Sequence, residues 1–408
     1  MLMEFSVKNF QSLKEEVTLD MKAIKSISEH KDSLIQNEVL PLAAIYGPNG
    51  GGKSTVLKAF KMLSIILARG IINVSSNESY SGFSPISPFK FDNHSVNEPT
   101  EFEIMININK IEYKYSISVL KDEIIEENLS KREKRNISMI FNRTKDCTVI
   151  GEEYKKDIMI TNISDSIPVL AYIKQFFKFK PVEDVLGWFM STYIIDYNQP
   201  RQEEMLWRRM LNLESEKEIY KIVKEKFLQK LKELDTSIVS YTIEKNKDNS
   251  RYFEPRIKTI HEVDNEKYEL SIDEESAGTK KLFGVLPNLV MALEMGSTVF
   301  IDELDAKLHP LLLEQIIQLF RNKETNCNNA QLIFTTHDLT TMTKENFRRD
   351  EIWFVCKNEE QYSHMYSLVE IRTEDGRVVR KDASYNKQYL EGRYGADPYF
   401  NRIRNWEN

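Results

Sequence analysis

The side chains best suited to chemistry gather in a glycine-rich stretch near the N-terminus, the phosphate loop (residues 47–54). Its sequence, GPNGGGKS, fits the pattern G-x-x-x-x-G-K-[ST] and stands between an apolar run and a helical pattern. Glycines let backbone N–H groups turn toward a phosphate, and the following helix adds its positive N-terminal end. We expect Lys53 to reach the β- and γ-phosphates of a nucleotide and the Ser54 hydroxyl to bind Mg²⁺. The alternative is a glycine-rich turn with an incidental Lys-Ser pair. The expected phosphate-binding residues are Gly47, Pro48, Asn49, Gly50, Gly51, Gly52, Lys53, Ser54 and Thr55.

The segment STVFIDELDAKLHP (297–310) supplies two adjacent carboxylates. Its apolar run predicts a buried strand that ends at Asp302 and Glu303. Ligands of open α/β sheets bind at the carboxyl ends of parallel strands, so we expect both residues beside the phosphate loop. There Asp302 would hold Mg²⁺ through its water shell, and Glu303 would act as general base toward an attacking water. The alternative is the acidic start of a helix, which the helix dipole favours.

Two further motifs lie on either side of that strand in the sequence. His337 ends the apolar run QLIFTTH, where it could contact the γ-phosphate or the attacking water; a structural histidine is the alternative. Ser276 and Gly278 lie in the motif SAGT, which precedes a helical pattern. Ser276 can cap that helix and Gly278 can allow a close approach, and capping alone would also explain the motif.

These motifs need strands and helices to position them. Hydrophobic periodicity predicts strands at 2–10, 16–23 and 39–46 and a helix from Lys53 to Ala68. Residues 70–90 are rich in Ser, Asn, Gly and Pro, which predicts a loop. A β-rich region follows to about 160, with a hairpin turn at Asn109-Lys110. A mostly helical region (168–235) contains a strand at 192–197, and strands follow at 237–245, 256–263 and 267–272. Beyond Glu275, helices and strands alternate as in parallel α/β sheets. The predicted helices begin after Ser276, span 310–322 and form a short segment after His337. The predicted strands lie at 297–302, 330–337 and 351–355.

This order predicts an α/β protein in three parts. Residues 1–165 would hold the phosphate loop and a β arm, residues 166–250 a mainly helical insert, and residues 251–408 the carboxylate strand, the SAGT motif and His337.

The composition indicates a globular protein of 408 residues, 41% of them hydrophobic and 29% charged. The net charge of −7 does not indicate nucleic-acid binding, although it leaves room for a local basic groove. Segments 129–136 and 174–181 could contact phosphates or bases, but a solvated strand end and an amphipathic helix explain them better. Segment 207–210 and Arg201 could contact an acidic partner or nucleic acid, or could have no such role, and both alternatives stay open. Three scattered cysteines predict no disulfide or structural zinc, and the absence of a signal-peptide core or membrane-length apolar run predicts a cytoplasmic location.

Taken in order, these motifs resemble the ATP-binding-cassette (ABC) ATPase heads of the SMC, RecF and OLD families. GPNGGGKST is similar to their phosphate loop, SAGTKK to a degenerate signature motif, VFIDELDAKLHP to their Walker B strand and D-loop, and TTHD to their switch histidine. The resemblance covers about 1–125 and 255–408. It implies a P-loop NTPase with an ABC-ATPase head built from both ends of the chain, using ATP and Mg²⁺. It also implies hydrolysis of ATP to ADP and phosphate, with Glu303, His337 and Lys53 as catalytic residues.

In such heads the nucleotide lies between two subunits. The resemblance therefore implies that Ser276 and Gly278 of one chain cap the γ-phosphate bound to the loop of the other. Asp305 would lie at the seam between them. We expect an ATP-dependent homodimer or a higher oligomer.

A narrower resemblance is carried by the segments NEPTEFEIMI, IDYNQPRQEEMLWRRM and YLEGRYGADPYF. They are similar to stand-alone AAA/ABC-like ATPases of bacteria and archaea that are found beside a second gene. Such pairs often occur in abortive-infection or anti-phage defence systems such as PARIS, Septu and RloB-type pairs. This resemblance implies a sensor or regulator of a separate effector, a nuclease or toxin encoded nearby.

The chain departs from these families in two respects. Its longest heptad-like stretch, around 216–234, is too short for the coiled coils of SMC proteins. The residues after His337 lack the Glu and Asp-x-Asp pattern of the Toprim nuclease module of OLD proteins. Two other functions stay open: a slow ATPase scaffold that holds an inactive effector, and a DNA-repair ATPase of the RecF kind.

Overall fold

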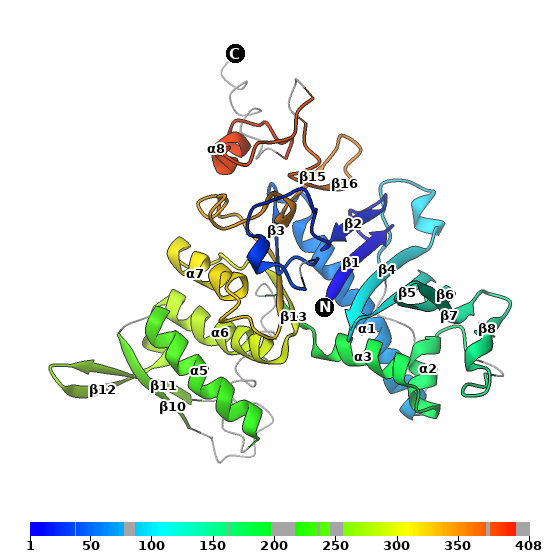
Figure 1. The fold of residues 1–408 in the computed structure, drawn as a ribbon, viewed down its shortest axis with the longest axis horizontal. Helices are drawn as coiled ribbons and strands as arrows, with labels where there is room; N and C mark the ends of the chain where they lie inside the picture. Colours follow the sequence, from blue (N-terminus) through cyan, green and yellow to red (C-terminus); the bar gives the residue numbers. More distant parts are fainter. Residues whose placement is uncertain are drawn as a thin grey trace. The chain divides into compact units, whose positions relative to one another are not determined.

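A computed structural model describes residues 1–36, 38–76, 86–160, 163–196, 217–234, 237–244, 256–372 and 376–396. The chain forms two compact units, the first made of residues 1–192 and 343–408 and the second of residues 193–342. Figure 1 shows the helices and strands of both. The first unit is therefore built from the two ends of the chain.

A seven-stranded antiparallel sheet of order β2-β1-β4-β5-β6-β7-β8 dominates the first unit. Its strands alternate between core and solvent, so that in β5 Tyr113, Tyr115 and Ile117 are at most 2% exposed. The expected hairpin turn at Asn109-Lys110 is confirmed, and both residues adopt positive φ. The strands are β1 (Leu2–Lys8), β2 (Val17–Asp20), β4 (Thr100–Ile108), β5 (Ile111–Leu120), β6 (Glu123–Glu133), β7 (Asn136–Arg143) and β8 (Thr148–Ile150).

A second group of strands in this unit joins the two chain ends. Strand β3 (Leu42–Tyr46), buried over its whole length, pairs in parallel with β15 (Ile352–Lys357). Strand β15 pairs in turn with the antiparallel β16 (Ser363–Ser367). The segment that leaves β3 is the phosphate loop, so this loop emerges beside strands from the other end of the sequence.

Helix α1 (Lys53–Ser76) follows the phosphate loop and runs beyond the predicted end at Ala68. The predicted loop over 70–90 is therefore wrong for 70–76, correct for 86–90, and outside the described residues for 77–85. Gly70 suits the helix because a Cβ there would lie 2.7 Å from Pro168 Cδ, where helix α2 (Val169–Phe176) packs closely. Phe60 of α1 packs between Phe5 of β1 and Trp188 of α3 (Lys180–Ser191), with ring centroids 5.4 and 5.9 Å apart.

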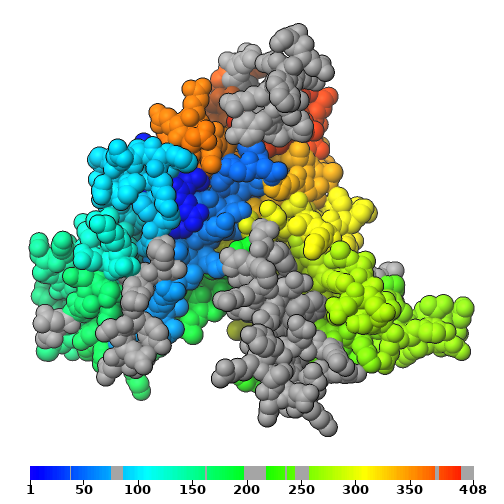
Figure 2. All heavy atoms as spheres, turned by 180° about the vertical axis from the view of Figure 1, so that it is seen from behind, coloured from blue at the N-terminus to red at the C-terminus, as the bar shows by residue number. Residues whose placement is uncertain are grey.

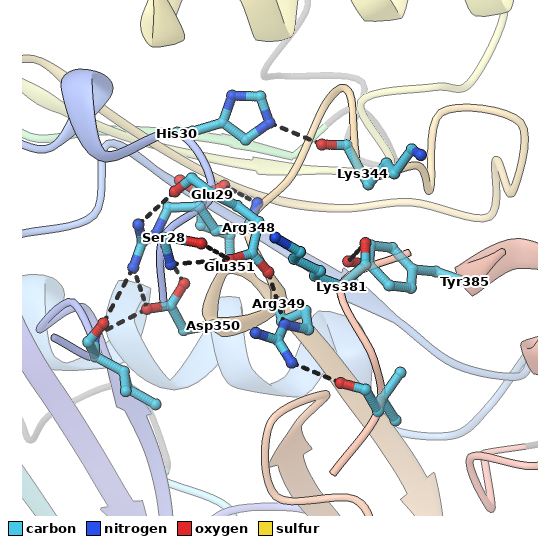
Figure 3. Close-up of polar contacts among 12 residues, drawn as sticks. Ser28, Glu29, His30, Lys344, Arg348, Arg349, Asp350, Glu351, Lys381 and Tyr385 are labelled. Atoms are coloured by element: carbon cyan, nitrogen blue, oxygen red, sulfur yellow. Dashed lines mark hydrogen bonds and ion pairs between the residues drawn. The ribbon is translucent and has the colours of Figure 1, made fainter. Parts of the chain in front are cut away.

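A buried ion-pair cluster fixes the start of β15 (Figure 3). Arg348, completely buried, donates from Nε and Nη2 to the two carboxylate oxygens of Asp350 at 2.9 and 2.8 Å, and from Nη1 to Glu29 O at 2.5 Å. Arg349 donates to Glu29 Oε1 at 2.7 Å and to Val379 O at 2.6 Å. The cluster thus ties together the segment before β3, the 3₁₀ turn before β15 and the C-terminal segment.

The C-terminal segment packs on β15 and β16 through aromatic rings. Tyr389 of α8 (Tyr385–Leu390) stacks on Phe354, with ring centroids 5.5 Å apart, and Tyr394 lies 5.3 Å from the same ring. Tyr366 donates a hydrogen bond to Tyr394 O at 2.5 Å. The segment YLEGRYGADPYF therefore packs on its own sheet as far as Ala396, and its last residues lie outside the described part of the chain.

The second unit contains the predicted α/β alternation. Strands β14 (Gln331–Thr335), β13 (Thr298–Asp302) and β9 (Tyr193–Asp196) are parallel neighbours, and helices α6 (Ala277–Met295) and α7 (Pro310–Arg321) alternate with them in the sequence. The short helix predicted after His337 is wrong. Asp338 instead accepts hydrogen bonds from the N–H groups of Thr340 and Thr341 at 3.3 and 2.9 Å, which stabilises a turn in place of a helix.

A small antiparallel sheet and a helix complete the second unit. Phe227 of α5 packs against Tyr241 and Phe283, with ring centroids 5.3 and 5.5 Å apart. Segment 207–210 and Arg201, for which contact with a partner was considered, lie outside the described residues. No helix in the described part of the chain is both long and apolar enough to span a membrane. The remaining elements are α5 (Glu218–Leu234), β10 (Ile238–Glu244), β11 (Arg256–Val263) and β12 (Glu266–Ser271).

Candidate functional site

The predicted site residues form two groups, one in each compact unit. The phosphate loop and Thr55 belong to the first unit, between β3 and the first turn of α1. Ser276, Gly278, Asp302, Glu303 and His337 belong to the second, at the start of α6 and the carboxyl ends of β13 and β14.

The phosphate loop has a backbone that only glycine adopts readily at three positions. Gly47, Gly50 and Gly52 have φ values of 148°, 73° and 113°. A Cβ at Gly47 would lie 2.0 Å from Val355 O in β15, and one at Gly52 would lie 2.2 Å from Ser363 Oγ in β16. The loop is therefore a narrow backbone cradle packed against β15 and β16, with no room for a side chain at Gly47 or Gly52.

Lys53 lies on this cradle and is only 6% exposed. Its ammonium donates to Gly47 O at 2.8 Å and to Pro48 O at 3.2 Å. Ser54 and Thr55 follow in the first turn of α1, and Thr55 N donates to Gly52 O at 2.9 Å. Glycine amides, an ammonium, a helix N-terminus and a hydroxyl are the donors and ligand that a nucleotide polyphosphate with Mg²⁺ requires, so the residues fit such a group.

The carboxylate edge, which we define as Asp302 to Asp305 at the carboxyl end of β13, is held by the neighbouring strand β14. Asp302 is 3% exposed and accepts a hydrogen bond from Thr335 Oγ1 at 2.6 Å. Thr335 Oγ1 in turn accepts a hydrogen bond from Glu303 N at 2.8 Å, and the backbone oxygen of Thr335 accepts one from Leu304 N at 3.1 Å. Glu303 has a φ of 51°, a left-handed conformation that is costly for a residue other than glycine and that these bonds maintain.

A buried lysine from α6 also contacts this edge. Lys281 is 7% exposed and donates to Glu303 O at 2.9 Å. Burial lowers its pKa to about 8, although the nearby charges of Asp305 and Glu303 act in the opposite direction. The helix that begins at the SAGT motif is thereby bonded to the backbone of the proposed general base.

The remaining predicted residues pack around the carboxylate edge. His337 N donates to Asp305 Oδ2 at 3.1 Å. Ser276 accepts from Thr279 N at 3.1 Å, which confirms it as the N-cap of α6. A Cβ at Gly278 would lie 3.3 Å from Lys307 O, so the first turn of α6 lies close to the segment after Asp305. The second unit thus brings its predicted site residues into one region.

Sequence reasoning missed a carboxylate that the structure places next to Asp302. Asp196 ends β9 and stands opposite Asp302 in the parallel register, and it is 6% exposed. The signal was present, because TYIID (192–196) and TVFID (298–302) share one pattern of an apolar run that ends in aspartate. No group of three or more His, Cys, Asp or Glu is arranged to hold a metal ion in the described residues. A Mg²⁺ ion bound mainly by water and nucleotide oxygens needs only one or two protein ligands.

Other contributors were not singled out by the sequence patterns. Their side chains reach the phosphate loop or the carboxylate edge from other parts of the fold. They are Ser12, Lys281, Thr335 and Ser363. Lys281 and Thr335 lie within the SAGTKK and TTHD motifs, but these motifs singled out Ser276, Gly278 and His337 instead.

Comparison with solved structures finds heads of SMC proteins. The SMC head bound to the C-terminal winged-helix domain of ScpA is 17% identical, with a TM-score of 0.43, over 90% of this chain and 97% of that chain. The SMC head domain from Thermotoga maritima is 15% identical, with a TM-score of 0.41, over 90% and 98%. A Smc head with an extended coiled coil, bound to the C-terminal domain of ScpA derived from Pyrococcus furiosus, is 15% identical, with a TM-score of 0.42, over 90% of this chain and 96% of that chain. No curated protein matches the chain.

Comparison with protein families gives one match that spans both groups of site residues. The model of the family described as "AAA domain, putative AbiEii toxin, Type IV TA system" matches residues 42–150 and 193–343. These ranges hold β3, the phosphate loop and α1 in the first unit, and α6, β13 and β14 in the second. The chain therefore belongs to this AAA-domain family and has the mixed α/β fold of a P-loop NTPase.

Proposed function

We propose that the protein binds and hydrolyses ATP as an ABC-type ATPase. The phosphate loop supports binding, because its glycines form a cradle and Lys53 and Ser54 supply a cation and a hydroxyl. Hydrolysis rests on Glu303, which follows the buried Asp302. Its left-handed conformation is maintained by the bond from its N–H to Thr335 Oγ1 and by the bond from Lys281 to its carbonyl oxygen. A protein that only bound the nucleotide would not need a second carboxylate held in this way.

Each residue has a separate role in this proposal. Lys53 would neutralise the β- and γ-phosphates. Ser54 would bind the magnesium ion directly, and Asp302 would hold it through its water shell. A bound Mg²⁺ would neutralise charge on the phosphate oxygens. Glu303 would accept a proton from the attacking water, and His337 would contact the γ-phosphate or that water.

The test separates binding from turnover. We expect Lys53→Ala to weaken ATP binding strongly, and Glu303→Gln to keep ATP binding while lowering phosphate release by about 100-fold. Glu324→Gln, at an exposed position, is the matched control and should hydrolyse ATP at the wild-type rate. Wild-type turnover in Glu303→Gln would remove Glu303 as the base, and unchanged binding in Lys53→Ala would refute the phosphate loop assignment.

We further propose that ATP joins two copies of the chain. Ser276 is exposed and caps the N-terminus of α6, so this helix presents its positive end beside the Ser276 hydroxyl. In the proposed dimer, Ser276 and Gly278 of one copy contact the γ-phosphate on the phosphate loop of the other.

Two substitutions at Ser276 test the dimer. Ser276→Asp keeps a helix cap but places a negative charge toward the phosphate, whereas Ser276→Asn keeps the cap without the charge. In a Glu303→Gln background with ATP, light scattering should report a dimer for Ser276→Asn and a monomer for Ser276→Asp. Equal dimerisation of both variants would contradict the assigned contact.

The protein would act as the sensor or regulator of a separate effector in anti-phage defence. Support comes from the family description, which names a putative toxin and a type IV toxin–antitoxin system. Co-expression with the product of the neighbouring gene, followed by purification with and without ATP, tests this pairing. If Glu303→Gln still releases the effector on addition of ATP, binding is the switch and the chain is a slow ATPase scaffold. A strongly salt-dependent affinity for DNA, with no effector bound, would favour the repair function instead.

A further inference from the structure

A buried hydroxyl from the C-terminal part of the chain bonds to the phosphate loop. Ser363, the first residue of β16, is completely buried and donates to Gly51 O at 2.7 Å. Its Oγ lies 2.9 Å from Ser12 Oγ, and its N–H donates to Ser12 O at 2.7 Å. Ser12 Oγ lies 3.4 Å from Thr55 Oγ1 in the first turn of α1. We call Ser12 and Ser363 the hydroxyl brace. In Figure 2 the surface around β16 (orange) borders the blue surface of the N-terminal part of the chain.

The brace fixes the orientation of one peptide group. In a planar trans peptide the C=O and the following N–H point in opposite directions. The bond from Ser363 to Gly51 O therefore turns Gly52 N–H away from β16. Gly52 has a φ of 113° and directly precedes Lys53, and a Cβ on it would lie 2.2 Å from Ser363 Oγ. Only glycine allows the hydroxyl and the loop to come this close.

We propose that Ser363, supported by Ser12, is a positioning residue for phosphate binding, which orients the Gly51–Gly52 peptide before the nucleotide arrives. The inference rests on the proposed function, because the oriented Gly52 N–H is a donor for a phosphate oxygen. Glycine-rich backbone has many accessible conformations, and a loop already held in one of them loses less entropy on binding. A hydrogen bond to a buried carbonyl selects that conformation in the free protein.

A second buried serine on the same strand provides a matched control. Ser367, at the other end of β16, is 2% exposed, and its Oγ contacts Arg349 O at 3.4 Å and Ile352 O at 3.3 Å. Ser367→Ala removes a buried hydroxyl from β16 as Ser363→Ala does, but from contacts with the start of β15. An effect specific to Ser363→Ala therefore reports on the loop and not on the packing of the strand.

The first measurement uses the nucleotide-free protein. The amides of Gly51 and Thr55 are bonded to Pro48 O and Gly52 O, so their hydrogen exchange reports on opening of the loop. We expect Ser363→Ala to raise exchange in peptides covering 47–56 about fivefold, Ser12→Ala to raise it less, and Ser367→Ala to leave it unchanged. Equal exchange in Ser363→Ala and Ser367→Ala would overturn the proposal. If Ser363→Ala does not fold, Ser12→Ala decides: a rise supports the brace, and no rise refutes it.

The second measurement is ADP affinity by fluorescence titration. We expect the Kd for ADP to rise about fivefold in Ser363→Ala and to stay at the wild-type value in Ser367→Ala. A wild-type Kd in Ser363→Ala would overturn the role in phosphate binding. If the wild-type protein binds neither ADP nor ATP, the proposed function fails, whereas the exchange experiment still decides whether the brace holds the loop.

Discussion

The phosphate loop and the carboxylate edge are held in place by different means. Around the loop, a Cβ at Gly47 or Gly52 would lie 2.0 or 2.2 Å from atoms of β15 and β16, so the geometry depends on the absence of side chains. Around the carboxylate edge, the geometry depends on side chains, because Thr335 and Lys281 bond to the backbone and carboxylate groups. Substitutions that add side-chain atoms should therefore disrupt the phosphate loop, whereas substitutions that remove a hydrogen-bonding side chain should disrupt the carboxylate edge.

The two regions also differ in where their partners come from. Ser363 lies 312 residues from Gly51, whereas Thr335 and Lys281 lie 33 and 22 residues from the groups that they hold. The phosphate loop therefore requires both ends of the chain to be folded together. The carboxylate edge forms from a continuous stretch of the second unit.

The largest expected effect is at Gly47. Gly47→Ala combines a positive φ with a Cβ 2.0 Å from Val355 O, a backbone atom that cannot move aside. We expect about 4 kcal/mol of lost stability and no measurable ADP binding. Gly50→Ala is the control, because Gly50 also has a positive φ, of 73°, but no atom lies within 4 Å of the added Cβ. We expect this variant to lose about 1 kcal/mol of stability from backbone strain alone. Thermal unfolding and ADP titration of the pair measure the difference; equal losses would show that strain, not contact, shapes the loop.

The free energy of unfolding is expected to change by about 3 kcal/mol with pH because of Lys281, at the carboxylate edge. The pKa of Lys281 is lowered by burial to about 8, below its value in the unfolded chain. Between pH 8 and 10.5 the unfolded chain binds more protons, so Lys281 contributes stability that is present above that range and is lost as the pH falls through 8. Lys281→Met should remove this slope in urea unfolding measured at several pH values. Lys280→Met, at a more exposed neighbour, should keep the slope, and a slope retained in Lys281→Met would contradict the assignment.

In the first unit, the buried Glu127 is expected to make the free energy of unfolding change with pH in the opposite direction. Glu127 is 1% exposed and accepts hydrogen bonds from Val169 N and Leu170 N at 2.7 and 3.1 Å, at the start of α2. Burial raises its pKa to about 7. Its contribution to stability is therefore full below pH 4.5 and lost as the pH rises through 7, by up to about 3 kcal/mol. Glu127→Gln should flatten the unfolding free energy over this range, whereas Glu126→Gln, which is exposed, should not.

The smallest effect on stability, about 1 to 2 kcal/mol, is expected for Thr335→Val. The change keeps the shape of the side chain but removes the hydroxyl that bonds to Asp302 and Glu303. We expect about tenfold slower phosphate release because Glu303 loses the bond that fixes its backbone. Thr298→Val removes a buried hydroxyl that bonds to Gln331 at the other end of the same strands, at 3.2 Å, and should leave turnover unchanged. Equal turnover in the two variants would show that Thr335 has no role in positioning Glu303.

Local patterns predicted most of the elements because each carries its own periodicity. The hairpin at Asn109-Lys110, the buried strand ending at Asp302 and the cap at Ser276 were all predicted from neighbouring residues. Helix α1 was predicted too short, because the Ser, Asn, Gly and Pro residues of 70–90 indicate a loop, whereas Gly70 permits a close contact of the helix with Pro168. Periodicity reports which residues are buried, but it does not report what a glycine faces.

The sequence by itself determined the identity of the chemical groups. The glycine spacing, Lys53, Asp302 and Glu303 follow from short motifs, because each motif needs only neighbouring residues to define it. The tertiary structure alone decided how these groups are held: Ser363 against Gly51, Lys281 against Glu303, and Asp196 opposite Asp302. Such contacts depend on strand register and on the meeting of distant segments, which are properties of the folded chain and are not encoded in any local stretch.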